Sequence, residues 1–116
     1  MALTHRSVSA SNNERLEFLG DALLGAIVAG KLYDRYPDLP EGDLTRLRSS
    51  LVKRETLARL ARGLDLGDIL KLGEGERKSG GWRRDSILSN ALEAIIGAVY
   101  LDSDFDTCKQ FVSGLY

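Results

Sequence analysis

The sequence predicts an all-α fold, a helical bundle packed around a buried central helix. Every patterned segment repeats its apolar residues with the helical period of about 3.6, and none alternates with the period of two that strands show. The segment 85–101 is apolar around almost its whole circumference, which is typical of a helix buried on all sides. With 116 residues, the chain is long enough for one domain, which we assign to 1–116.

Composition excludes several functional classes. The formal net charge is −1, so a surface for polyanions must come from local clustering of the 16 Lys and Arg. A single cysteine, Cys108, excludes an internal disulfide and a cysteine zinc site, and it fits a reducing, cytoplasmic location. A single histidine, His5, argues against a Ser-His-Asp triad, and a hydrogen-bonded structural role is expected for it. No apolar run approaches the roughly 20 residues of a membrane span, so no membrane partner is expected.

The first predicted helix runs from about residue 14 to residue 36, where Pro37 ends it. Glu14, Glu17 and Asp21 fall within one narrow arc of this helix, because residues three, four and seven apart share a face. Beyond Asp21 the helix is apolar on nearly every side, so it should be buried, with Glu17 and Asp21 at the edge of a core.

Caps and turns set the other boundaries. Residues 1–11 are mostly polar and are interpreted as the tail of an element. Asn12 or Asn13 can cap the first helix, and Asp43 can cap the second. The expected later helices are 44–51, a second piece ending at Gly63, a short helix within 65–72, the central helix 85–101 and a final helix 106–116.

The segment 73–84 is the longest stretch expected to be irregular. It holds several glycines, four basic residues and Trp82. Such a loop can contact phosphates, but a plain surface loop, with Trp82 anchoring it to the body, is an equally good interpretation.

The acids of the first helix allow two interpretations. They can be a solvated helix start that suits the helix dipole, or they can hold a hard cation such as Mg²⁺. The central helix favours the second, because Asn90 and Glu93 share one of its faces and a buried glutamate needs a partner. If the two helices pack face to face, three carboxylates and an amide converge. Such a site hydrolyses phosphodiesters, since the metal activates water and stabilises the leaving oxygen. A di-iron site is excluded because no Glu-x-x-His motif is present.

The segment Asn13–Asp21 resembles the signature of the ribonuclease III family, in its bacterial form. Further matching segments are Ala2-Leu3-Thr4-His5-Arg6-Ser7, Glu41-Gly42-Asp43-Leu44 followed by Arg46 and Arg48, Lys78-Ser79-Gly80-Gly81 followed by Arg83-Arg84, and Leu92 to Ala98 ending in Tyr100-Leu101-Asp102.

The resemblance implies a homodimeric endonuclease domain that cleaves double-stranded RNA in rRNA and mRNA processing. It implies Mg²⁺ as the cofactor, with Mn²⁺ as a substitute, and 5′-phosphate and 3′-hydroxyl ends. By motif position, Glu17, Asp21 and Glu93 match metal-binding and catalytic acids. The other implied roles are RNA or dimer contacts for Glu14 and Glu41 and a dimer contact for Phe18. Because they are basic, we expect Arg46, Arg48, Lys78, Arg83 and Arg84 to contact phosphates.

The sequence departs from the family pattern at Asn90, where the family has a metal-binding aspartate. An amide is a weaker ligand, so we expect weaker metal binding and a loss of rate of roughly 10²–10³-fold. The family's N-terminal segment and its double-stranded-RNA-binding domain are expected to lie outside 1–116. The alternatives are an impaired RNA-binding or dimeric scaffold of the same fold, and a structural helical domain whose acidic cluster is fortuitous.

Overall fold

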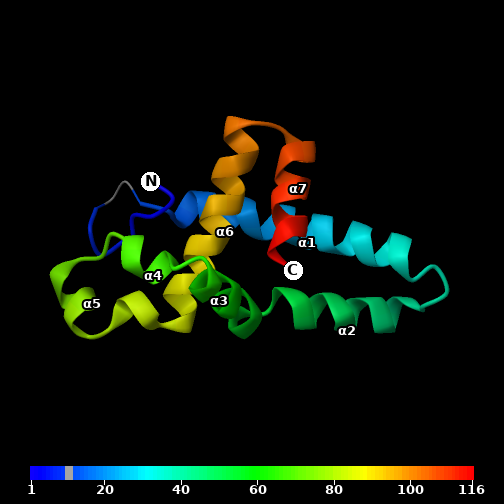
Figure 1. The fold of residues 1–116 in the computed structure, drawn as a ribbon, viewed down its shortest axis with the longest axis horizontal. Coiled ribbons are helices and arrows are strands. Elements are labelled where there is room, and N and C mark those ends of the chain that lie inside the picture. Colours follow the sequence, from blue (N-terminus) through cyan, green and yellow to red (C-terminus); the bar gives the residue numbers. More distant parts are fainter. Residues whose placement is uncertain (10–11) are drawn as a thin grey trace.

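The computed structural model describes residues 1–9 and 12–116, and Figure 1 shows a fold built from helices. Among the described residues, extended segments pair only in a parallel bridge between Thr4 and Lys71, so the all-α prediction is confirmed. None of the described helices is long and apolar enough to cross a membrane. The elements are α1 (Glu14–Arg35), α2 (Glu41–Val52), α3 (Arg54–Gly63), α4 (Leu66–Ile69), α5 (Glu74–Lys78), the 3-10 turn η1 (Gly81–Arg83), α6 (Asp85–Asp102) and α7 (Phe105–Leu115).

Helix α6 is the centre of the bundle, as the sequence predicts. It packs against α1, α3, α4, η1 and α7, and Figure 1 shows α1 crossing it on one side. Its side chains Leu88, Leu92 and Ile96 are almost completely buried, and half of its 18 residues are buried. Burial of such side chains contributes about 1.5–3 kcal/mol each, so α6 is the main source of core stability.

Helix α1 is buried along one side only, and the expectation of burial on nearly every side is wrong. Its buried apolar side chains continue the arc of Glu17 and Asp21 toward the core, whereas Ala22 and Ala26 are exposed. Small alanines lose little by facing solvent, so an apolar circumference does not require neighbours on every side. The buried apolar residues of α1 are Leu24, Ile27, Val28 and Leu32.

Beyond the crossing with α6, α1 continues beside α2 as an extended arm (Figure 1). The predicted start of α2 at Asp43 is wrong by a few residues, because the carbonyl of Pro40 already accepts hydrogen bonds from the N–H groups of Asp43 and Leu44. The proline φ of −72° is compatible with a helix start, so Glu41 opens the helix. At the start of α1, the Asn12 side chain accepts a hydrogen bond from the N–H of Glu14, as the capping prediction allows.

The segment 73–84 is more ordered than the sequence predicts. It folds into α5 and η1, with a single turn between them. Glu74 lies in the first turn of α5 and forms an i,i+4 ion pair of 3.0 Å with Lys78 in the last, an orientation that suits the helix dipole. Trp82 rests its backbone and ring against Gly67, so it anchors the segment to α4.

Candidate acidic active site

Two glycines let α1 and α6 cross at very short range. A Cβ added to Gly20 would lie 1.6 Å from the carbonyl oxygen of Glu93, and one added to Gly97 would lie 2.5 Å from the carbonyl oxygen of Leu16. Only residues without a side chain permit this approach of two backbones. The crossing therefore holds Glu93 directly against the acid-bearing turn of α1.

The side chains at the crossing line an open cavity of about 270 Å³, which we call the acidic cavity. Its residues are Glu14, Glu17, Phe18, Asp21 and Glu93. The structure thus brings together the carboxylates that the sequence predicts to converge from two helices. The apolar Phe18 ring lies beside them with 81% of its surface exposed.

Glu93 is the most buried acid of the cavity, with 8% of its surface exposed. Burial raises the pKa of its carboxyl to about 9, and a hydrogen bond to Asp21 and the charges of Asp21 and Glu17 act in the same direction. The protonated form is therefore favoured at neutral pH by the protein alone. A cation beside the carboxyl would reverse this preference.

Glu17 is partly buried and links the acidic cavity to a second one. Burial raises the pKa of its carboxyl, and the charges of Glu14 and Asp21 raise it further, while the Arg6 charge opposes them. Three acids thus repel one another at this end of α1, and the nearby cation relieves only part of that repulsion.

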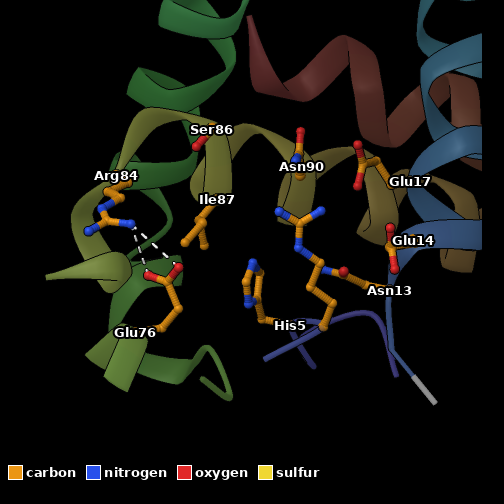
Figure 2. A pocket seen from close by; sticks show the side chains of 10 residues that line it. His5, Asn13, Glu14, Glu17, Glu76, Arg84, Ser86, Ile87 and Asn90 are labelled. Atoms are coloured by element: carbon orange, nitrogen blue, oxygen red, sulfur yellow. Dashed lines mark hydrogen bonds and ion pairs between the residues drawn. The ribbon is translucent and has the colours of Figure 1, made fainter. Parts of the chain in front are cut away.

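The second cavity, which we call the adjoining cavity, has a volume of about 250 Å³ and shares Glu14 and Glu17 with the acidic cavity. Figure 2 shows Asn90, Glu17 and Glu14 along one side and Arg84 with Glu76 on the other. The predicted amide therefore lines the adjoining cavity, next to Glu17, rather than the acidic cavity. The complete lining is His5, Arg6, Asn13, Glu14, Glu17, Glu76, Arg84, Ser86, Ile87 and Asn90.

The N-terminal segment 1–9 forms part of this wall, so its interpretation as the tail of an element is incomplete. The N–H of Lys71 donates a hydrogen bond to the carbonyl of Leu3 over 2.7 Å, and the carbonyl of Lys71 accepts one from the N–H of His5 over 2.9 Å. The N–H of Asn13 donates a hydrogen bond to the carbonyl of Thr4 over 2.9 Å, which connects the segment to the start of α1. Residues 10 and 11 lie outside the described part of the chain.

His5 makes the structural hydrogen bond expected of it, since its Nδ1 lies 2.8 Å from the Ser7 hydroxyl. Burial lowers the pKa of the imidazole and Arg6 adds to this, although Glu76 opposes both. The neutral ring is thereby favoured, so His5 contributes hydrogen bonding rather than charge to the cavity wall.

Arg84 is the predicted phosphate contact that lies nearest to the acids, and its guanidinium is already engaged. Its Nη1 lies 3.1 Å from Glu76 Oε2, and its Nη2 donates to the Ser79 hydroxyl over 3.0 Å. The Glu76 carboxylate also packs against Gly81, where a Cβ would lie 2.5 Å from Oε2. The ion pair thus fixes the end of η1 against α5.

Glu14, also predicted to contact RNA, lines both cavities, whereas the other residues with this predicted role line neither. Glu41 and Arg48 line a groove between α1 and α2, with a volume of about 240 Å³. Arg46 forms an ion pair with Asp43 on the surface of α2. The remaining two are Lys78, paired with Glu74, and Arg83, whose guanidinium lies 5.4 Å from the centre of the Trp82 ring.

The donor set of the acidic cavity fits a hard divalent cation, which takes carboxylate oxygens. Among residues 1–9 and 12–116, no three His, Cys, Asp or Glu side chains stand close enough to form a ready metal site. Asp21 is exposed and Glu17 partly so, and both can change rotamer toward the fixed carboxyl of Glu93. We therefore expect a divalent cation to draw the carboxylates of Glu17 and Asp21 toward that of Glu93 when it binds.

The sequence profile described as "Ribonuclease-III-like" matches residues 1–116. Ribonuclease 3 of Pseudomonas putida is 64% identical over 110 residues, covering 95% of this chain and 48% of that protein. Ribonuclease 3 of Vibrio cholerae is 59% identical over 116 residues, covering 100% of this chain and 52% of that protein, so the chain spans about half the length of these relatives. The solved nuclease domain of ribonuclease III from Campylobacter jejuni, a structure concerned with a region involved in dimer formation, superposes with a TM-score of 0.96 at 46% identity, covering 98% of this chain and 80% of that chain. This chain belongs to the ribonuclease-III-like family.

Proposed function

We propose that the chain is an endonuclease domain that hydrolyses double-stranded RNA, leaving 5′-phosphate and 3′-hydroxyl ends, in the cytoplasm and in the processing of rRNA and mRNA. The observation that carries the proposal is the meeting of Glu17, Asp21 and Glu93 at the glycine crossing of α1 and α6. Support also comes from the relatives, which are named Ribonuclease 3. The buried thiol of Cys108 fits a reducing compartment.

We propose Mg²⁺ as the cofactor, with Mn²⁺ as a substitute. Glu17, Asp21 and Glu93 would hold it, with the Asn90 amide beside Glu17. When bound, such an ion lowers the pKa of water and stabilises a leaving oxygen. The protein's own part is to fix Glu93 by backbone packing and to keep it shielded from solvent.

Basic side chains of α2 and of the segment 73–84 would hold the RNA by its phosphates. A-form RNA is recognised by shape, 2′-hydroxyls and phosphates more than by base sequence, so these contacts carry little sequence information. Glu14 and Glu41 are proposed to help fix the RNA or the dimer. The basic residues proposed for phosphate contacts are Arg46, Arg48, Lys78, Arg83 and Arg84.

We propose that the chain acts as a homodimer through the face that presents Phe18. The Phe18 ring, 81% exposed beside the acidic cavity, offers apolar surface that a second copy would cover. The Campylobacter jejuni structure concerns dimer formation in a domain of the same fold. Sedimentation at micromolar concentration should give a dimer, and a monomer there would exclude this assembly.

Asn90 favours a second candidate function, an RNA-binding or dimeric scaffold with impaired catalysis. The amide beside Glu17 carries no charge, so it is a weaker ligand for Mg²⁺ than a carboxylate. Retention of Glu14, Glu17, Asp21, Glu41 and Glu93 argues against a long-standing loss of activity.

Cleavage of a labelled RNA duplex in Mg²⁺ by the chain and by its Asn90→Asp variant separates these functions. We expect the variant to cut roughly 10²–10³-fold faster, which corresponds to about 3–4 kcal/mol in the barrier. Equal, measurable rates would show that the amide suffices. Binding without cleavage by either protein would support the scaffold instead.

A further inference from the structure

We infer that Arg6 binds a backbone phosphate of the RNA in the adjoining cavity, close to the bond held at the carboxylates. The inference rests on the proposed function, because it assigns one more contact to the same RNA. Arg6 lies outside the helices, in a segment that matches the family pattern but for which the resemblance implies no role.

The residues on both sides of Arg6 are held in place. The N–H of His5 donates to the carbonyl of Lys71, and the Ser7 hydroxyl accepts a hydrogen bond from the N–H of Gly73 over 2.8 Å. Gly73 also packs closely against Ser7, since a Cβ added to Gly73 would lie 2.5 Å from the carbonyl oxygen of Ser7. Arg6 therefore projects from a fixed point, which limits the backbone entropy lost when it binds a ligand.

The guanidinium of Arg6 is available, unlike that of the other arginine in the cavity. It is exposed, and within the described part of the chain no hydrogen bond or ion pair engages it. Arg84, by contrast, is committed to Glu76 and Ser79. Arg6 thus keeps its donors for a ligand, and a planar guanidinium matches the oxygens of a phosphate in a two-point contact.

The position of Arg6 relates this phosphate to the cleavage site. Its charge acts on Glu17, which lines both cavities. A strand whose scissile phosphate reaches the acidic cavity would continue past Glu14 and Glu17 into the adjoining cavity. Among the described residues that line the two cavities, Arg6 is the arginine without an ion pair, and it would offset the repulsion between the RNA and these acids.

Binding of a short RNA duplex over a range of salt concentrations tests the inference, with Arg6→Ala and Arg6→Lys as variants. Arg59→Ala is the matched control, since Arg59 is exposed on α3, lines neither cavity and carries the same charge. Integrity of the duplex is checked after each titration, and thermal melting confirms that each variant is folded.

We expect Arg6→Ala to lower the slope of log K against log salt by about one unit and to weaken binding about tenfold, because one phosphate contact is lost. Arg6→Lys should keep the slope, and Arg59→Ala should match the parent chain. A slope for Arg6→Ala equal to that of Arg59→Ala, with RNA binding intact, overturns the role of Arg6 alone. Loss of slope in folded Arg6→Lys also overturns it, since the charge is retained. Absence of duplex binding by the parent chain overturns the proposed function itself.

Discussion

Helix α1 takes part in two regions of opposite character, the crossing with α6 and the arm with α2. At the crossing two backbones touch through Gly20 and Gly97, and the acid Glu93 is buried. In the arm, α2 has no buried residue, and its charges lie on the surface. The difference indicates that the carboxylates need a geometry set by backbone packing, whereas contacts along RNA tolerate exposed and adjustable side chains.

The largest expected effect is that of Gly20→Ala. The added Cβ would overlap the carbonyl of Glu93, so α1 and α6 must separate and the core beneath them must open. We expect a loss of at least about 3 kcal/mol in the free energy of unfolding, measured by urea denaturation. Gly25→Ala is the control on the same helix, because its Cβ meets nothing within 4 Å, and it should stabilise the chain by about 0.5–1 kcal/mol. Equal effects of the two variants would contradict the account of the crossing.

The second prediction concerns the pH dependence of stability in metal-free buffer. The pKa of Glu93 rises from its ordinary value of 4.5 to about 9 on folding, so the folded chain binds this proton more tightly than the unfolded chain. This contribution is complete below about pH 4.5 and is lost as pH rises toward 9. Melting temperatures in EDTA should therefore fall across this range for the parent chain and less steeply for Glu93→Gln. Parallel curves for the two proteins would show that Glu93 is not shifted.

The smallest effect is expected in the arm. Arg46 and Asp43 form an ion pair whose side chains are 75% and 41% exposed, and such pairs contribute little. Arg46→Ala should change the free energy of unfolding by less than about 0.5 kcal/mol in the same urea titration. A loss above about 1 kcal/mol would mean that the arm is more tightly constrained than its exposure indicates.

The sequence predicts the helices and the acids because both leave local signals. The period of apolar residues locates α1 and α6, and the spacing of Glu17 and Asp21 places them on one face. The close approach of α1 and α6 at Gly20 and Gly97 is not predicted from the sequence. It depends on which helices pack together, and the sequence around either glycine does not indicate the other. Gly97 among the small residues of α6 was the one available signal.

The N-terminal segment shows a second limit of sequence reasoning. Its contacts with Lys71 and Asn13 are backbone hydrogen bonds to distant residues, and these have no periodic pattern. The i,i+4 spacing of Glu74 and Lys78, by contrast, is a local signal that favours α5. Long-range pairing thus decides where Arg6 and His5 lie, and local propensity does not.

Calorimetric titration with Mg²⁺ of the parent chain, Glu93→Gln and Glu41→Gln tests the central claim most directly. Both variants remove one carboxylate charge, but Glu93 lines the acidic cavity and Glu41 lies in the groove of the arm. The account predicts that Glu93→Gln loses Mg²⁺ binding and that Glu41→Gln binds as the parent chain does. Equal Mg²⁺ binding by all three proteins would contradict a metal site at the crossing of α1 and α6.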